Sequence, residues 1–518
     1  MSILTVKNLS HGFGDRAIFD DVSFRLLKGE HIGFIGANGE GKSTFMNIIT
    51  GKLMPDEGSV EWSNRVRVGY MDQHAALEKG NTIRDILRDA FKYLFDMEEE
   101  ILKISDKMAE ATPEELEKLL EDMGTLQDIL DHSGFYTIDA KIEEVAAGLG
   151  LKDVGLDKDV TDLSGGQRTK VLLAKLLLEN PDILLLDEPT NYLDEAHIEW
   201  LKRYLQNYEN AFILISHDIP FLNSVINLIY HVENLKITRY VGDYDNFKRI
   251  HEANKKQLEA AYERQQQEIA KLEDFVARNK ARVATTGMAR ARQKKLDKME
   301  RIELAGEKPK PEFNFKESRT SGKVIFETKD LVIGYDSPLT KPLNLKMERG
   351  QKIALVGANG LGKTTLLRSL MGFINPLEGE VTLGDYQEIG YFEQEIKDAN
   401  YKTCIEEVWQ DFPSFTQYEV RSALAKCGLT TKHIESKVVV LSGGEQAKVR
   451  LCKLINKPSN ILILDEPTNH LDVEAKDELK RALNDYKGTI LLVCHEPEFY
   501  RDVVNEVWNC EDWTLKIT

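Results

Sequence analysis

The sequence predicts an α/β protein composed of two similar domains with a helical segment between them. Three observations support this prediction. Several motifs occur twice in the 518 residues, and each pair is separated by one of two fixed distances. In each copy, apolar runs typical of buried strands alternate with helical patterns, which favours a parallel sheet. Between the copies lies a stretch whose apolar residues recur at helical spacing.

The composition, 42% hydrophobic and 30% charged, is ordinary for a globular protein. The formal net charge of −18 argues against a surface that coats nucleic acid throughout, but it permits a local basic patch. The N-terminus lacks a signal peptide, and the longest apolar runs are far below the ~20 residues of a membrane-spanning helix. We therefore expect a cytoplasmic protein. The five cysteines lack C-x-x-C spacing, which fits free thiols rather than a zinc site or a disulfide framework; they are Cys404, Cys427, Cys452, Cys494 and Cys510.

The repeat is visible in two sets of motifs. GANGEGKST at Gly36–Thr44 returns as GANGLGKTT at Gly357–Thr365, an offset of 321 residues. LSGGQ, which begins at Leu163, returns as LSGGE from Leu441, an offset of 278. Because the offset falls from 321 to 278, the first copy carries a net insertion of 43 residues between these motifs. The predicted domains are residues 1–244, with a helical insertion at about 90–145, a linker at 245–315, and a second copy at 316–518.

Each copy contains a glycine-rich G-x-x-x-x-G-K-[S/T] sequence between a strand-like run and a helical pattern. In that context backbone N–H groups and the lysine bind phosphate, and the hydroxyl after the lysine binds Mg²⁺. We predict that Lys42 and Lys363 reach the β/γ oxygens of ATP and that Ser43 and Thr364 ligate Mg²⁺. The other residues of these loops predicted to contact ATP are Gly36, Asn38, Gly39, Gly41, Thr44, Gly357, Asn359, Gly360, Gly362 and Thr365.

An all-apolar run in each copy ends in an Asp-Glu pair. Such a run suits a central parallel strand, and α/β sheets bind ligands at the carboxyl ends of their strands. We predict that Asp187 and Asp465 hold Mg²⁺ through water. The adjacent Glu188 and Glu466 are predicted to polarise the attacking water.

A third motif places a serine and two glycines at the start of a helical pattern. Glycines in that position expose N–H donors to an anion. The residues predicted to bind ATP in this way are Ser164, Gly165, Gly166, Gln167, Ser442, Gly443, Gly444 and Glu445.

Together these motifs resemble those of ATP-binding-cassette proteins, and the resemblance covers nearly all of both halves. It implies a monomer whose cassettes pair head to tail, so that the phosphate loop of one cassette and the signature of the other enclose each ATP. It also implies four further roles: contact with Mg²⁺, contact with the γ-phosphate, the junction of the two sites, and stacking on adenine. In that order the residues are Gln73 and Gln394, His217 and His495, Asp194 and Asp472, and Phe13 and Tyr335.

The two copies differ at three points. Glu40 lies inside the first phosphate loop where Leu361 stands in the second. The first signature ends in Gln and the second in Glu, and Ser-His-Asp in the first copy is Cys-His-Glu in the second. None of these differences removes a catalytic group, so both sites are expected to hydrolyse ATP, at rates that differ.

The linker is predicted to form a projecting hairpin of two long helices with a bend at Ala284–Gly287. The first helix would extend ~50 Å at 1.5 Å per residue. The apolar stripes comprise Ile250, Leu258, Ala261, Ile269, Leu272 and Val276 in the first helix, and Leu296, Met299 and Ile302 in the second.

The linker is also basic. Residues 245–316 hold 18 basic and 12 acidic residues, a net charge of +6 that leaves −24 for the remainder. A basic tip on an acidic body suits contact with one anionic site, although a solvated helix face is the alternative. The residues predicted to contact RNA are Arg278, Lys280, Arg282, Arg290, Arg292, Lys294 and Lys295.

Tandem cassettes, no membrane segment and a basic helical linker together resemble the ABC-F family of translation factors. That resemblance implies the ribosome, with its rRNA and tRNA, as partner and the exit-tRNA site as the place where the linker binds. The linker resembles those of general translation factors more than the extended loops of antibiotic-resistance members. Some members carry an arm at the position of the insertion, and a plain helical elaboration is the alternative.

Other readings compete with this one. A fused ATPase subunit of a membrane importer has the same number of cassettes, but it gives no reason for a basic hairpin between them. A DNA-repair ATPase of the excision type is disfavoured because its zinc-binding cysteines are missing. The linker is too short for a cohesin-like coiled coil.

Overall fold

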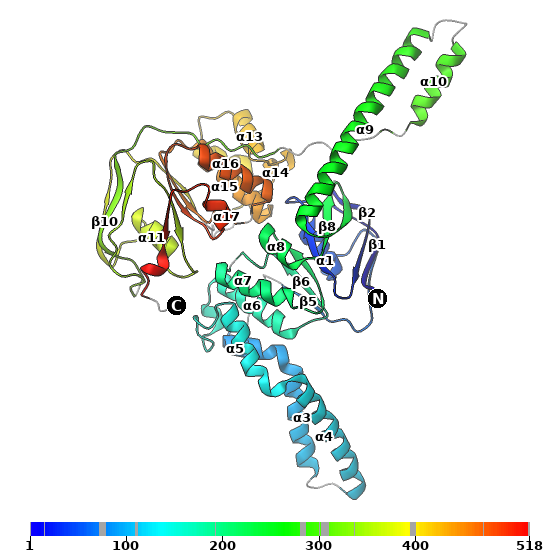
Figure 1. Ribbon diagram of the computed structural model, residues 1–518, viewed down its shortest axis with the longest axis vertical. Coiled ribbons are helices and arrows are strands. Elements are labelled where there is room, and N and C mark those ends of the chain that lie inside the picture. The colour runs from blue at the N-terminus through cyan, green and yellow to red at the C-terminus, as the bar shows by residue number, and fades with distance from the viewer. Residues whose placement is uncertain are drawn as a thin grey trace.

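In the computed structural model, two α/β bodies lie side by side, and two helical hairpins project from the first of them (Figure 1). The structure describes residues 2–14, 16–71, 79–108, 112–191, 193–279, 286–299, 301, 310–335, 337–393, 400–469 and 471–515.

The first body, or cassette 1, contains a six-stranded sheet in the order β5-β6-β7-β3-β8-β9, parallel except for β9. A three-stranded antiparallel sheet, in the order β2-β1-β4, lies beside it. The strands are β1 (Ser2–Phe13), β2 (Arg16–Leu27), β3 (His31–Ile35), β4 (Glu57–Trp62), β5 (Val68–Tyr70), β6 (Ile183–Asp187), β7 (Ala211–Ile215), β8 (Leu228–Glu233) and β9 (Lys236–Val241). The helices are α1 (Lys42–Ile49), α2 (Ile83–Arg88), α3 (Lys92–Met108), α4 (Pro113–Ser133), α5 (Ile138–Gly148), α6 (Gly165–Glu179), α7 (Glu195–Gln206) and α8 (Ile219–Val225).

The apolar run of β6 is explained by burial on both faces of the sheet. Ile183 and Leu185 belong to the core shared with β1, β2 and α1, whereas Leu184 and Leu186 belong to the core beneath α6 and α7. Successive side chains of a strand point to opposite faces, so a strand covered on both sides has no position for a polar residue. The run therefore ends where the strand leaves the core, at Asp187.

The second body, or cassette 2, repeats this plan with a five-stranded parallel sheet in the order β14-β15-β16-β12-β17 and a small sheet in the order β11-β10-β13. Its strands are β10 (Val324–Val332), β11 (Lys346–Glu348), β12 (Lys352–Val356), β13 (Glu378–Leu383), β14 (Ile389–Phe392), β15 (Ile461–Asp465), β16 (Thr489–Val493) and β17 (Glu506–Asn509). Its helices are α11 (Lys363–Leu370), α12 (Cys404–Asp411), α13 (Gln417–Lys426), α14 (Thr431–Glu435), α15 (Gly443–Asn456), α16 (Val473–Asp485) and α17 (Pro497–Tyr500). The predicted α/β class with two similar domains is confirmed.

The linker forms a hairpin of α9 (Tyr244–Asn279) and α10 (Thr286–Lys298). The predicted bend at 284–287 is wrong in its second half, because Thr286 and Gly287 already belong to α10. The second helix has 13 residues against 36 in the first, so it covers only the outer part of α9. Ile269 and Leu296 are buried in that part, whereas Leu258, nearer the cassette, is 46% exposed.

A second hairpin, formed by α3 and α4, projects from cassette 1 at the other end of the molecule from α9 and α10 (Figure 1). It lies within the predicted helical insertion at about 90–145, and its second helix has Pro113 in the first turn. Thr112 caps that helix, because its backbone N–H and its hydroxyl both donate to Glu115 Oε2, at 3.0 and 2.7 Å. The sequence left open whether the insertion is an arm, and the structure gives it the shape of one.

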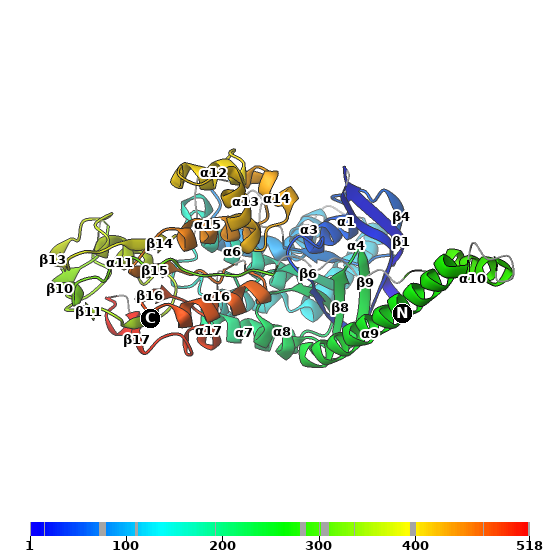
Figure 2. The ribbon, with the colours of Figure 1, turned by 90° about the horizontal axis from the view of Figure 1, so that it is seen from above.

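No helix in the described part of the chain combines the length and the apolar surface that crossing a membrane requires. α7 and α8 of cassette 1 lie beside α17 of cassette 2 in both views (Figures 1 and 2). This contact brings the carboxyl ends of the two main sheets toward the interface between the cassettes.

Candidate ATP sites

In each phosphate loop the lysine side chain donates hydrogen bonds to carbonyl oxygens at the start of the same loop. The Lys42 ammonium donates to the carbonyl oxygens of Gly36 and Ala37, at 2.8 and 3.2 Å. The Lys363 ammonium makes the same two hydrogen bonds in cassette 2, at 2.7 and 2.9 Å. Burial lowers the pKa of both ammonium groups, and nearby carboxylates oppose that shift. A buried ammonium whose hydrogen-bond partners are neutral carbonyls can gain a stronger, charge-assisted interaction when an anion such as phosphate binds.

The last glycine of each phosphate loop lies where a larger residue would be strained, because its φ is positive and neighbouring side chains are close. Gly41 has φ +100°, and a Cβ there would lie 2.3 Å from Ile18 Cγ2. Gly362 has φ +91° and packs against Ile333 and Leu339. Because both glycines cap the helix that follows, the loop turns with its backbone N–H groups at a helix N-terminus, which favours an anion.

A hydroxyl and a carboxylate meet beside each loop. Ser43 Oγ donates to Asp187 Oδ2 at 3.1 Å, and Thr364 Oγ1 donates to Asp465 Oδ2 at 2.8 Å. Burial raises the pKa of both aspartates, to about 6 for Asp465. Asp465 Oδ1 is buried and accepts no hydrogen bond from the described residues. Hard oxygen ligands and an unsatisfied buried carboxylate fit Mg²⁺, whose charge would reverse the pKa shift. The predicted glutamines, Gln73 and Gln394, lie outside the described residues.

The two catalytic candidates share an unusual backbone conformation. Glu188 and Glu466 both have φ +48°, in the left-handed region that non-glycine residues rarely adopt. Their N–H groups nevertheless continue the sheet, donating to Ile215 O at 2.9 Å and to Val493 O at 3.0 Å. Such strain costs of order 1–3 kcal/mol and persists where the surroundings enforce it, typically at functional sites.

The histidines predicted to contact the γ-phosphate lie beside these glutamates in different ways. In cassette 1, His217 Nε2 is 3.1 Å from Asn38 Oδ1 and 3.5 Å from Glu188 Oε1. In cassette 2, His495 Nε2 is 3.2 Å from Glu466 Oε1. The second oxygen of Glu466 also accepts from Asn469 Nδ2, at 2.6 Å.

The electrostatic consequence differs between the sites. Burial and the adjacent Asp187 raise the pKa of Glu188 to about 8. Burial also acts to raise the pKa of Glu466, but the contact with His495 and the charge of Lys363 outweigh burial and lower it. Before nucleotide binds, therefore, Glu188 is largely protonated at neutral pH and Glu466 is ionised.

Each signature motif is a helix cap. Ser164 Oγ accepts from Gln167 N–H at 3.3 Å, and Gln167 Oε1 accepts from Ser164 N–H at 3.0 Å. Ser442 and Glu445 exchange the same two hydrogen bonds, at 3.4 and 2.9 Å. The change from Gln to Glu between the signatures is thus explained, because either side chain completes the capping box. Both serines are exposed.

The aspartates at the junction reach across the interface between the cassettes. Asp194 accepts from His197 N–H at 3.2 Å and from Asn359 N–H, in the phosphate loop of the other cassette, at 3.5 Å. Asp472 accepts from the Lys448 ammonium at 2.8 Å. Burial acts to raise the pKa of Asp472, but Lys448 outweighs burial and lowers it, with a smaller contribution from His217 of cassette 1. Each aspartate therefore lies at the site of the opposite cassette, which is the head-to-tail order that the resemblance implies.

The aromatic residues predicted to stack on adenine stand at strand ends with open faces. Phe13 is 51% and Tyr335 is 60% exposed. The segment that follows Phe13 packs through Ile18 on the last glycine of the first phosphate loop, and the segment around Tyr335 packs through Ile333 and Leu339 on the second. Both rings thus belong to segments that border a phosphate loop.

One group at the interface escaped the sequence analysis. Lys476 Nζ lies 2.8 Å from Glu496 Oε1, and the charge of Lys476 acts on both Glu188 and Asp218 of cassette 1. The Lys476 ammonium thus lies between two acidic residues, Asp218, which follows His217 in cassette 1, and Glu496, which follows His495 in cassette 2. A signal was present: Lys476 follows Asp472 by four residues, which places both on one face of a helix.

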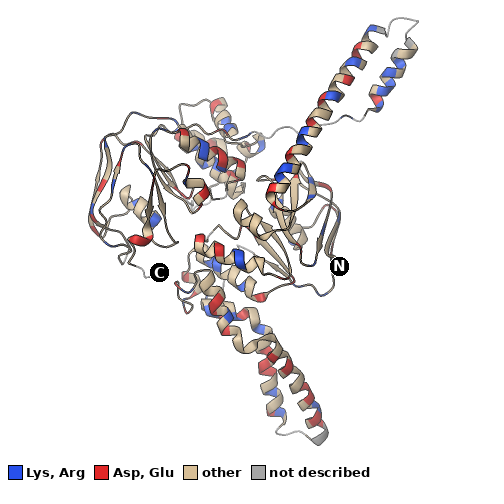
Figure 3. Cartoon of the chain, in the orientation of Figure 1, with Lys and Arg blue, Asp and Glu red and all other residues tan. Residues whose placement is uncertain are grey.

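Basic residues lie along both helices of the linker hairpin, and some of them have partners within it (Figure 3). Arg278 pairs with Asp274 at 2.8 Å, and Lys295 pairs with Glu268 at 2.6 Å. The Arg292 guanidinium lies 3.5 Å from the centre of the Phe275 ring. Arg290 and Lys294 are exposed on α10, while Lys280 and Arg282 lie outside the described residues.

Comparisons with known proteins agree with this geometry. A family described as ABC transporter matches residues 19–191 and again 340–469, and a second family with the same description matches residues 230–315, which include α9 and α10. A solved structure of an archaeal ribosome recycling factor, aABCE1, in complex with the ribosomal stalk protein aP1 is similar in fold, with a TM-score of 0.58 at 21% identity over 97% of this chain and 87% of that one.

Relatives match the chain over nearly its full length. An ABC transporter ATP-binding protein of Bacillus subtilis (strain 168), YfmM, is 75% identical over 100% of both chains. ABC transporter F family member 2 of Arabidopsis thaliana is 36% identical over 98% of this chain and 76% of its own. The energy-dependent translational throttle protein EttA of Mycobacterium tuberculosis (strain CDC 1551 / Oshkosh) is 31% identical over 96% of this chain and 89% of its own.

Proposed function

This chain belongs to the F family of ATP-binding-cassette proteins, and on that premise we propose that it is a Mg²⁺-dependent ATPase that binds the ribosome in the cytoplasm and modulates translation. The observation that carries the proposal is that candidate ATP-site residues of the two cassettes meet across the interface, where Asn359 N–H donates to Asp194, while a basic hairpin projects away from the cassettes. The exit-tRNA site is the proposed place of binding, as the resemblance implies.

In the proposed reaction, each glutamate takes the proton of a water that attacks the γ-phosphorus of ATP, and ADP leaves. Lys42 and Lys363 neutralise charge on the β/γ oxygens, and His217 and His495 contact the γ-phosphate. The hydroxyl and aspartate pairs beside each loop, Ser43 with Asp187 and Thr364 with Asp465, would hold Mg²⁺, which would stabilise negative charge on the phosphates. The exposed hydroxyls of the signature serines donate to the γ-phosphate of the opposite site, which closes the cassettes on ATP.

Contact with RNA is proposed for the α10 side of the linker hairpin. Arg290 and Lys294 are exposed there, and the four-residue spacing places both on one face of the helix. Lys295 and Arg292 are held within the hairpin by Glu268 and Phe275, so they shape the tip and add positive potential. The acidic α3–α4 hairpin and the acidic cassettes would repel RNA elsewhere, which restricts contact to the tip (Figure 3).

Sedimentation tests this proposal. The Glu188→Gln plus Glu466→Gln variant should keep ATP, stay closed and co-migrate with ribosomes in a sucrose gradient. Adding Arg290→Glu and Lys294→Glu should weaken ribosome binding and flatten its dependence on salt, because two phosphate contacts are lost. A matched control reverses two exposed lysines elsewhere, Lys103→Glu and Lys118→Glu on the α3–α4 hairpin, and should leave the salt dependence unchanged.

Two results would contradict the proposal in different ways. Unchanged ribosome binding by the Arg290 and Lys294 variant would remove the hairpin tip as the contact. Association of the closed variant with membranes and not with ribosomes would favour the ATPase subunit of an importer.

A further inference from the structure

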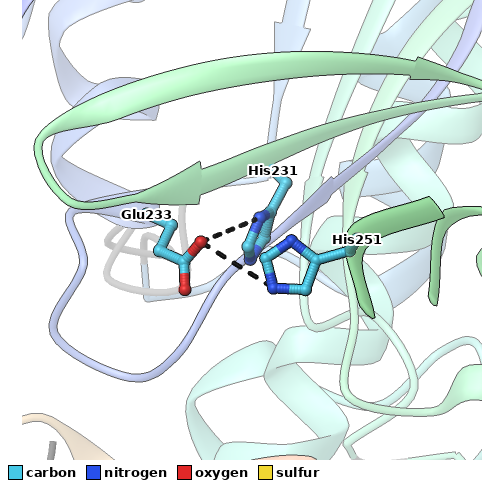
Figure 4. Close-up of side chains that lie close together, drawn as sticks. All are labelled: His231, Glu233 and His251. Carbon is cyan, nitrogen blue, oxygen red and sulfur yellow. Dashed lines mark ion pairs between the residues drawn. The ribbon is translucent and has the colours of Figure 1, made fainter. Parts of the chain in front are cut away.

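Outside the ATP sites, one group of side chains has the composition of a metal centre. His231 and Glu233 lie two residues apart on β8, and His251 lies on the second turn of α9 (Figure 4). One ligand atom from each of the three residues lies within 4.8 Å of the others. The group joins the last parallel strand of cassette 1 to the first helix of the linker.

The distances between the glutamate oxygen and the histidine nitrogens are too long for hydrogen bonds, but they are close to the distances between ligand atoms around a metal ion. Glu233 Oε2 is 3.9 Å from His231 Nδ1 and 3.8 Å from His251 Nε2. Both distances exceed the upper limit of a hydrogen bond, about 3.2 Å. A zinc-class ion with bonds of about 2.0–2.1 Å would hold tetrahedral ligand atoms about 3.3–3.5 Å apart, so the carboxylate needs to move by only a few tenths of an ångström.

The surroundings fit a metal in two further respects. The Phe247 ring packs against both imidazoles, with ring centres 4.9 Å from His231 and 5.4 Å from His251. Glu233 is 47% exposed, which leaves an open side for water as a further ligand.

We propose that His231, Glu233 and His251 bind a divalent transition metal of the zinc class. Two imidazoles and one carboxylate with an open position form a three-ligand set that such ions accept. The set uses no cysteine, so the sequence pattern that argued against a cysteine-based zinc site does not exclude it.

The site would fasten the linker to the cassette directly behind the first phosphate loop. His231 pairs with Ile35 in the sheet, and the carbonyl of the next residue, Val232, lies 2.7 Å from where a Cβ of Gly36 would stand. A metal bound there connects α9 to β8, the strand that pairs with β3, and β3 leads into the phosphate loop. It therefore restrains the direction in which the hairpin leaves cassette 1, independently of what the hairpin tip contacts.

Metal titration of the full chain tests the proposal. The protein is purified through a tag without histidines, stripped with a chelator, and titrated with Co²⁺ in the absence of nucleotide, then with Zn²⁺ in competition. We expect one Co²⁺ per chain, visible d–d absorption without the charge-transfer band of thiolates, and displacement by Zn²⁺. His251→Ala and Glu233→Gln should each weaken binding by at least about tenfold, since each removes a ligand.

His132→Ala is the matched control, because this exposed histidine on α4 bonds only a backbone carbonyl of its own helix; it should bind Co²⁺ as the unaltered chain does. His251 lies on α9 with its side chain 27% exposed, so its replacement by alanine is expected to preserve the fold. Zn²⁺ should raise the thermal midpoint of the unaltered chain and of His132→Ala, but not of the two ligand variants. The proposal is overturned if the unaltered chain takes up no stoichiometric Co²⁺, or if folded His251→Ala and Glu233→Gln variants bind as tightly as it does.

Discussion

The two ATP sites of this chain have the same backbone and different electrostatics. Glu188 and Glu466 share one φ value, and both glutamates continue the sheet through their N–H groups. Yet the pKa of Glu188 is raised to about 8, whereas that of Glu466 is lowered. The motif therefore determines where the carboxylate stands, and neighbouring side chains determine whether it carries a proton.

The difference arises from the partners of the histidines. His217 is nearer to Asn38 than to Glu188, while His495 is nearest to Glu466. Lys476 acts in the opposite direction, because its charge lowers the pKa of Glu188 across the interface. The corresponding position of cassette 1, 278 residues earlier, is Ile198. Similar motifs thus produce two sites that are unequal before ATP binds.

The largest expected effect comes from removing the carboxylates. The double variant Glu188→Gln plus Glu466→Gln should lower turnover by at least about 100-fold, because proton transfer by a positioned base contributes about 10²–10⁴. At pH 7, Glu466→Gln should cost more turnover than Glu188→Gln, because only Glu466 is largely ionised there. Phosphate release at saturating ATP measures both, and equilibrium ATP binding is the control, since none of these variants should change it more than a few fold. Equal losses from the two single variants would mean that nucleotide binding removes the difference between the sites.

A smaller effect is expected in the pH dependence of the single variants. In Glu466→Gln only Glu188 remains, and with a pKa of about 8 its ionised fraction rises from about a tenth at pH 7 to about nine tenths at pH 9, so kcat/KM should rise nearly tenfold. In Glu188→Gln the remaining Glu466 has a lowered pKa and is ionised throughout, so kcat/KM should stay flat from pH 6 upwards. Steady-state rates in buffers of constant ionic strength give both profiles. A flat profile for both variants would contradict the difference in protonation.

The sequence predicted the elements that local pattern determines. The apolar run of β6 required burial on both faces, and the spacing of glycine, lysine and hydroxyl required a turn into a helix. Protonation of Glu188 was out of reach, because the raised pKa of this residue depends first on burial, which only the assembled fold determines. The sequence also could not show that His217 lies nearer to Asn38, 179 residues away, than to Glu188. The cross-interface role of Lys476 likewise depends on how the two cassettes face each other.

The linker illustrates the same limit. Its apolar spacing predicted two packed helices, and Ile269 and Leu296 are buried between them. The spacing of apolar residues did not reveal that α10 is too short to cover Leu258. The length of α10 depends on where the helix ends, and the apolar pattern does not determine that position. Whether Arg290 is exposed while Lys295 is paired also depends on the opposite helix, which supplies Glu268.

The smallest expected effect concerns the signature caps, where the two cassettes differ by one side chain. Ser164→Ala and Ser442→Ala should each destabilise their cassette by about 1 kcal/mol, the usual cost of losing an N-cap. Gln167→Glu should change stability by less than about 0.5 kcal/mol, because glutamate completes the same capping box. Glu445→Gln should cost more than Gln167→Glu, because Glu445 also lies 3.2 Å from His433 Nε2, whereas the corresponding position in cassette 1 is Gly155. Thermal unfolding at constant pH measures all four variants; if Gln167→Glu were the more damaging exchange, the caps would differ in a way that these contacts do not explain.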